Sequence, residues 1–81
     1  MSDFETLMAK ADRSSNNFRF RDLCRLAELA GFILEKRGGT SHLQYHHPAV
    51  RIRISLLEAG HGRAKPYQLR QILRFIEQHV L

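Results

Sequence analysis

The segment VRIRISL, residues 50–56, constrains the fold of this chain more than any other part of it. An aliphatic residue stands at every second position, and an arginine or a serine stands at each position between. Successive side chains of a β-strand point to opposite faces, so this alternation predicts a strand with one aliphatic face and one basic face. Such a strand needs neighbouring strands and a second layer that covers its aliphatic face.

Two further strands are predicted before this one. Residues 32–37 form the first and end at the pair Gly38-Gly39, and residues 42–47 form the second and end at Pro48. The short connection at Pro48-Ala49 predicts a hairpin between the second and third strands. We expect the glycine pair to form a turn that needs positive φ, because glycine adopts this conformation without steric cost.

Apolar residues at helical spacing predict three helices. The first covers residues 4–11, and the second covers residues 21–30, with Gly31 where a helix C-terminus favours glycine. The third begins at Pro66, which suits a first helical turn. The order α-α-β-β-β-α predicts an α+β two-layer sandwich, in which a three-stranded antiparallel sheet has helices on one face and water on the other.

Composition limits the classes of function. The chain has 81 residues, which predicts one domain, and a net charge of +5, most of it from arginine. Arginine's planar fork suits phosphate, so the charge favours a polyanion partner, with nucleic acid ahead of membrane lipid. One cysteine excludes an internal disulfide, and no apolar run reaches the roughly 20 residues of a membrane span. The first residues lack the pattern of a secretory signal, so we expect a cytoplasmic protein.

The open face of the predicted sheet collects the residues that carry chemistry. If Leu43 and Tyr45 enter the core, the other residues of the second strand face water together with the arginines of the third. Imidazoles beside guanidinium groups form a phosphate-binding surface, and an imidazole moves protons near neutral pH. This predicted surface consists of His42, Gln44, His46, Arg51 and Arg53.

Two other chemistries are disfavoured by spacing. On a strand, His42 and His46 lie roughly 13 Å apart at about 3.3 Å per residue, too far for one metal ion, so we expect no metal and no cofactor. Ser41 and His42 are adjacent and point to opposite faces, with no acidic residue nearby, which disfavours a catalytic triad. Cys24 lies on an apolar helical stripe and is expected to be a small core residue.

Several short motifs, in order, resemble a known family. The helix end LAELAGF is followed by Gly39-Thr40-Ser41-His42, then by Tyr45 and His47-Pro48, and then by GRAKPYQLRQILRFIE at residues 62–77. This series resembles the HicA toxins of bacterial toxin–antitoxin pairs, which commonly have Gly-Ser-His-His, an aromatic residue and His-Pro. Here Leu43 stands where that family has its second histidine. Residues 1–17 resemble the N-terminal extension of one branch, and residues 18–81 resemble the HicA domain itself.

The resemblance implies a double-stranded-RNA-binding-domain-like fold and a small ribonuclease that cleaves mRNA, arrests growth and is blocked by a HicB-type antitoxin. The family's essential histidine corresponds to His42, and His47-Pro48 would be structural. Three readings stay open: a metal-independent endoribonuclease, a non-catalytic RNA-binding module, and an interaction protein with an acidic partner. Beside catalytic His42 and the turn at Gly38 and Gly39, the predicted RNA-binding residues are Lys36, Arg37, Ser41, Gln44, His46, Arg51 and Arg53.

Overall fold

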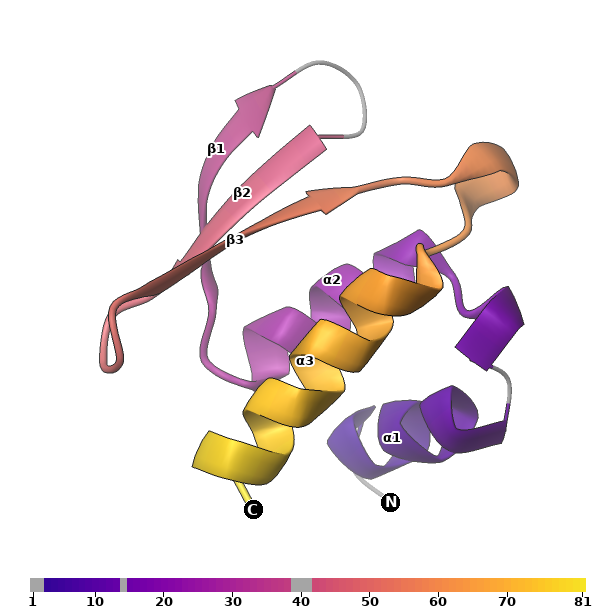
Figure 1. Ribbon diagram of the computed structural model, residues 1–81, viewed down its shortest axis with the longest axis horizontal. Coiled ribbons are helices and arrows are strands. Elements are labelled where there is room, and N and C mark those ends of the chain that lie inside the picture. The colour runs from indigo at the N-terminus through magenta and orange to yellow at the C-terminus, as the bar shows by residue number, and fades with distance from the viewer. Residues whose placement is uncertain (1–2, 14, 39–41) are drawn as a thin grey trace.

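The predicted order of helices and strands is present in the computed structural model, which describes residues 3–13, 15–38 and 42–81 (Figure 1). The α+β prediction is confirmed, and the arrangement is consistent with a double-stranded-RNA-binding-domain-like fold. The elements are α1 (Asp3–Arg13), the short 3₁₀ turn η1 (Ser15–Asn17), α2 (Phe20–Leu29), β1 (Ile33–Gly38), β2 (His42–His47), β3 (Ile52–Leu57), the 3₁₀ turn η2 (Gly60–Gly62) and α3 (Pro66–His79).

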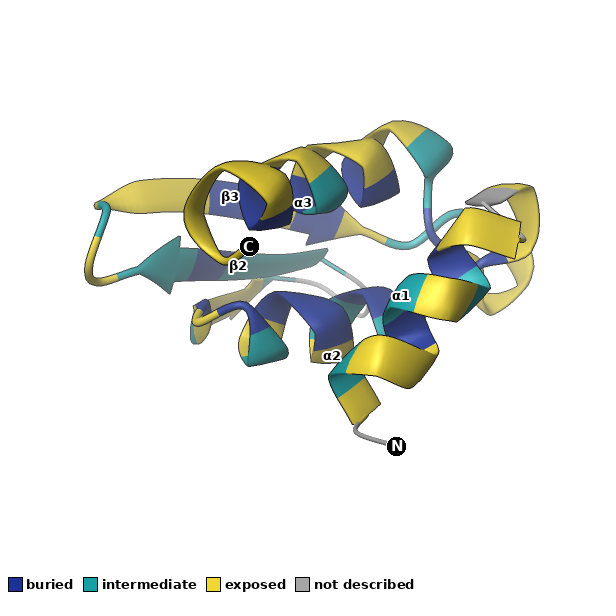
Figure 2. Cartoon of the chain, turned by 90° about the horizontal axis from the view of Figure 1, so that it is seen from below, coloured by how far each residue is buried: buried dark blue, intermediate teal, exposed yellow. Residues whose placement is uncertain are grey.

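The three strands form one antiparallel sheet in the order β1-β2-β3, with β2 in the centre. Helices α2 and α3 lie side by side against one face of it (Figures 1 and 2). Tyr45, Ile54 and Leu56 point into this interface, and each is at most 5% exposed. They pack against apolar side chains of the two helices, and none of the described helices lies over the opposite face of the sheet (Figure 1).

The hairpin between β2 and β3 is confirmed, but the predicted start of β3 is wrong. A four-residue turn at residues 48–51 precedes the strand, which begins at Ile52 and not at Val50. The Arg51 N–H closes this turn by donating to the His47 carbonyl at 2.8 Å, and Arg51 has a φ of 56°. Arg51 therefore belongs to the turn and not to the face of the strand.

A β-bulge in β1 changes which residues face water. Leu34 pairs with Tyr45 and Lys36 pairs with Gln44, so Glu35 is an extra residue between them. A bulge of this kind shifts the later alternation of the strand by one position. Arg37 consequently pairs with Leu43, whose side chain packs against the core, and lies on the helix side of the sheet.

Two expectations about β1 are therefore corrected. Arg37 does not share the open face with the other predicted RNA-binding residues, because the bulge reverses its direction. Gly38 is the last residue of β1, and it is not among the described glycines with positive φ, so it needs no special turn conformation. Gly39 lies outside the described residues.

Helix α1 packs on the outer side of the helical layer, away from the sheet (Figures 1 and 2). Leu7 and Ala11 are its buried residues. Two ion pairs join it to α2, Lys10 with Asp22 at 2.8 Å and Asp3 with Arg25 at 3.0 Å. The apolar stripe of α1 thus contributes to the same core as the other helices.

Gln68 joins α3 to the outer edge of β3. Its side chain is buried, accepts a hydrogen bond from the Leu57 N–H at 3.1 Å and donates one to the Ser55 carbonyl at 3.2 Å. Because β3 is an edge strand, these backbone groups have no strand beside them, and one amide side chain takes the place of a neighbouring strand.

We expect Gln68→Ala to lower the free energy of unfolding by about 1–3 kcal/mol, because it leaves a buried donor and a buried acceptor without partners. Urea unfolding followed by circular dichroism measures this change. Gln71→Ala is the matched control, since Gln71 is exposed on the same helix and should change stability by less than about 0.5 kcal/mol. Equal effects of the two substitutions would contradict a role for Gln68 in holding β3.

Candidate nucleic-acid interface

The strand register shows which side chains share the open face of the sheet. Directly paired residues point to the same side, and the pairs that contain His42, Gln44 and His46 alternate with the pairs that point into the core. Six of the predicted site residues come together here, including Gly38, and Arg37 does not. The open face consists of Ile33, Glu35, Lys36, Gly38, His42, Gln44, His46, Arg53, Ser55 and Leu57.

His42 is the first residue of β2 and pairs with Gly38 on one side and Leu57 on the other. A Cβ added to Gly38 would lie 3.7 Å from His42 Nδ1, so the half-buried imidazole stands beside the glycine. Among the described residues, no carboxylate forms an ion pair with His42. The prediction for Ser41 concerns a residue outside the described ranges and stays a prediction.

His46 has the acidic neighbour that His42 lacks. The Glu35 carboxylate lies 3.5 Å from His46 Nδ1, a nitrogen that is buried and makes no hydrogen bond. Because a carboxylate only accepts hydrogen bonds, this contact favours a proton on Nδ1. In neutral His46 the Nε2 lone pair is then available to a ligand.

Glu35 also neutralises Arg53. The Arg53 Nε and Nη2 donate to the two carboxylate oxygens at 3.2 and 3.3 Å. Glu35 was not among the residues predicted for this site, because it lies far from His46 along the chain. Strand alternation starting from Leu34, which is partly buried against the core, was the available signal, because it places Glu35 on the opposite face.

Arg51 reaches this cluster from the hairpin turn. It lines a small cavity of about 200 Å³ together with His46, Pro48 and Arg53. Arg51 therefore lies near His46 and Arg53, as predicted, although it is not a strand residue. The basic residues at this end of the sheet lie about 13 Å along β2 from His42, so the two histidines would face different phosphates of a bound chain.

We expect Glu35→Gln to tighten binding of single-stranded RNA by about three- to tenfold, because it frees the Arg53 fork for phosphate. Fluorescence anisotropy with a labelled, non-cleavable RNA measures this. Glu77→Gln is the control: it makes the same change of net charge at an exposed position of α3 and should change RNA affinity less. Weaker binding by Glu35→Gln would show instead that the carboxylate positions Arg53 and His46.

His47 lies on the helix side, where both ring nitrogens have partners. Nε2 lies 3.1 Å from the Ala30 carbonyl oxygen, and Nδ1 accepts the Ala49 N–H at 3.2 Å. The ring packs against Phe32 and Phe75 with centroids 5.2 and 5.1 Å away. These contacts are those of a structural residue that anchors the end of β2 on the helices.

A polar group lies under the centre of the sheet on the helix side. The buried Tyr45 hydroxyl donates to Glu28 Oε2 at 3.0 Å, and burial raises the pKa of this phenol, so it stays a donor. Burial likewise raises the pKa of the Cys24 thiol, which disfavours the thiolate that a nucleophile needs. Cys24 is partly buried against the core, as expected.

The described residues offer neither a cluster of metal-binding side chains nor a membrane-spanning helix. Residues 3–13, 15–38 and 42–81 contain no group of three or more metal-binding side chains close enough to hold an ion. None of the helices in these ranges has the length and apolar character required to cross a lipid bilayer.

Fold and surface together define a small α+β protein with a histidine- and arginine-bearing open sheet. A family model described as the HicA toxin of bacterial toxin–antitoxin matches residues 20–78, and the chain belongs to this family. The family is one of RNase-type toxins, which makes the chain a toxin of a toxin–antitoxin system. Comparisons with curated proteins and with solved structures gave no match.

Proposed function

We propose that this chain is a metal-independent endoribonuclease that cleaves mRNA, with His42 as the general acid/base. The observation that carries the proposal is the position of His42 at the edge of an open face that also bears Lys36, Gln44 and His46. RNA cleavage requires a group that transfers protons, which an imidazole can be, and neighbouring groups that bind the phosphate and stabilise its charge.

The reaction needs few groups. His42 takes the proton of a ribose 2′-hydroxyl, and the 2′-oxygen forms a bond to the adjacent phosphorus. The bond from phosphorus to the 5′-oxygen breaks, and the imidazolium returns the proton to this leaving oxygen. The products are a 2′,3′-cyclic phosphate and a 5′-hydroxyl, while Lys36 stabilises charge on the phosphate.

Single-stranded RNA is the substrate that fits an open sheet, because its bases and backbone are accessible without unpairing. The surface offers two basic regions, at His42 with Lys36 and at His46 with Arg51 and Arg53. The second region would hold a phosphate several nucleotides away from the cleaved bond.

The partner in this proposal is a HicB-type antitoxin that covers the open face. Exposed Ile33 and Leu57 favour such a contact, since they are 50% and 38% exposed on the same face as His42. In the free toxin, diethyl pyrocarbonate should modify His42, and in the complex His42 should be protected. Unchanged reactivity in the complex would place the antitoxin elsewhere.

The test is incubation of purified protein with a mixed-sequence RNA and with its 2′-O-methyl analogue, a metal chelator being present throughout. Cleavage of the first alone, with cyclic phosphate ends, is the expected result. Binding of both without cleavage would favour the second candidate, a non-catalytic RNA-binding module. The observation in favour of that candidate is that no described carboxylate orients His42.

A further inference from the structure

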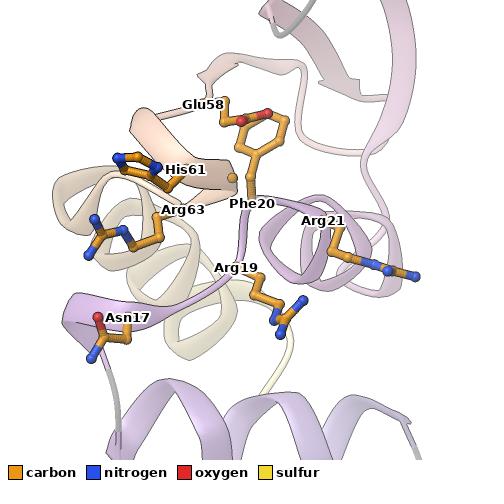
Figure 3. Close-up of a pocket in the computed structure, with 8 residues that line it drawn as sticks. Asn17, Arg19, Phe20, Arg21, Glu58, His61 and Arg63 are labelled. Carbon is orange, nitrogen blue, oxygen red and sulfur yellow. The ribbon is translucent and has the colours of Figure 1, made fainter.

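A second basic site lies outside the open face, between the start of α2 and the loop that joins β3 to α3. It is a cavity of about 540 Å³ (Figure 3). Figure 3 shows its basic side chains in two groups, with Arg19 and Arg21 on one side and His61 and Arg63 on the other. The lining residues are Asn17, Arg19, Phe20, Arg21, Glu58, His61, Gly62 and Arg63.

The backbone on both sides of this cavity is held in place by hydrogen bonds. The Ala64 N–H donates to the Phe18 carbonyl and the Ala59 N–H donates to the Arg63 carbonyl, each at 2.8 Å. Arg19 and Arg63 also face each other across an isolated β-bridge. Segments that are far apart in the sequence are therefore joined by backbone hydrogen bonds, which do not depend on their exposed side chains.

The charges in the cavity are unbalanced. Three arginines line it against one carboxylate, that of Glu58. None of these arginines takes part in an ion pair within the described parts of the chain, whereas Lys10, Arg25 and Arg53 each pair with an acidic residue. Guanidinium groups without a partner carboxylate on two sides of a hollow suit an anionic ligand, and their forks match phosphate oxygens.

The cavity lies at the same end of the sheet as His42. Leu57, the strand partner of His42, is followed directly by Glu58, which lines the cavity. A chain lying over His42 and continuing past the end of β3 would thus reach the arginines. The cavity and the surface around His42 are neighbours, which favours a polynucleotide that contacts both. A free phosphate ion would need the cavity alone.

We propose that this cavity binds a backbone phosphate of the same RNA strand that lies over His42, and so determines the position of the substrate. The inference rests on the proposed function and adds to it a phosphate contact outside the open face. Asn17 and Arg19 precede residues 20–78, the part that matches the family, and the other lining residues lie within it.

The test compares variants in their binding to a 2′-O-methyl RNA over a series of salt concentrations. Arg19→Gln combined with Arg63→Gln should weaken binding about tenfold and lower the salt slope by roughly 0.7, the value for one phosphate contact on a single strand. Arg70→Gln with Arg74→Gln is the matched control, since these exposed arginines of α3 do not line the cavity. Glu58→Gln should change affinity in the opposite direction.

The outcomes separate this inference from the proposed function. If the unchanged protein cleaves RNA and the cavity variant binds like the control, the inference is overturned and the proposed function stands. If the unchanged protein binds RNA without cleaving it, and the cavity variant alone loses affinity, the ribonuclease proposal fails and the site remains. If the unchanged protein does not bind RNA, both are overturned, and an acidic protein becomes the alternative ligand of the arginines.

Discussion

Replacing His42 by alanine is expected to lower the rate of RNA cleavage by about 10²- to 10⁴-fold, the usual contribution of a general acid/base. In the proposed mechanism this imidazole exchanges protons with the ribose and the leaving oxygen. The loss should appear in kcat, because the phosphate-binding residues of the open face remain. Single-turnover cleavage at saturating protein measures the chemical step directly.

The fold should tolerate this substitution. His42 is half-buried at the first position of β2, and none of the described residues forms an ion pair with it. His46→Ala is the matched control on the same face of the same strand, and it should raise KM more than it lowers kcat. If His42→Ala cleaves at the unchanged rate while His46→Ala does not, the proton-transfer group is His46, the imidazole that Glu35 orients.

Gly31→Ala is expected to destabilise the protein by at least about 3 kcal/mol, the largest stability effect that the structure predicts. Gly31 has a φ of 105°, and an added Cβ would stand 2.5 Å from His47 Nε2. A side chain at such a φ costs about 1–3 kcal/mol by itself. Phe32 and Phe75 pack against the His47 ring, so moving the ring away from the added Cβ would break these contacts.

Thermal unfolding measures this effect, and a loss of this size should lower the Tm by more than about 10 °C in a domain of this length. Gly60→Ala is the control: nothing lies within 4 Å of its added Cβ, so the Tm should change little. Combining Gly31→Ala with His47→Ala removes the clash but not the φ strain. An unchanged Tm for Gly31→Ala would mean that the end of α2 rearranges.

The proposed ribonuclease and the stability of the fold therefore depend on different histidines. His42 lies on the open side of β2, where the proposal places the chemistry, and His47 holds the other end of β2 against the helices. Their separation follows from strand alternation, because residues an odd number of positions apart point to opposite faces. Substitutions at the two positions should consequently be separable by assays of activity and of unfolding.

The local elements were predictable because each depends on neighbours in the chain. The bounds of β2, 42–47, and the start of α3 at Pro66 are those expected from alternation and from proline. The strand predicted at residues 50–56 lies at residues 52–57 instead, because pairing with β2 and a four-residue turn determine where it begins. Arg51 lies in the turn, yet it lines the same cavity as His46. No local sequence pattern indicates that a turn residue would lie there.

The sequence by itself determined the order of the elements, the two-layer architecture and the strand that presents His42, because these follow from the spacing of apolar residues along a short segment. Only the tertiary structure decided the bulge that turns Arg37 away, the grouping of Glu35 with His46 and Arg53, and the cavity between Arg19 and Arg63. The physical reason is that register and bulges minimise the free energy of the whole core, so contacts between distant residues are set by packing and not by local preference.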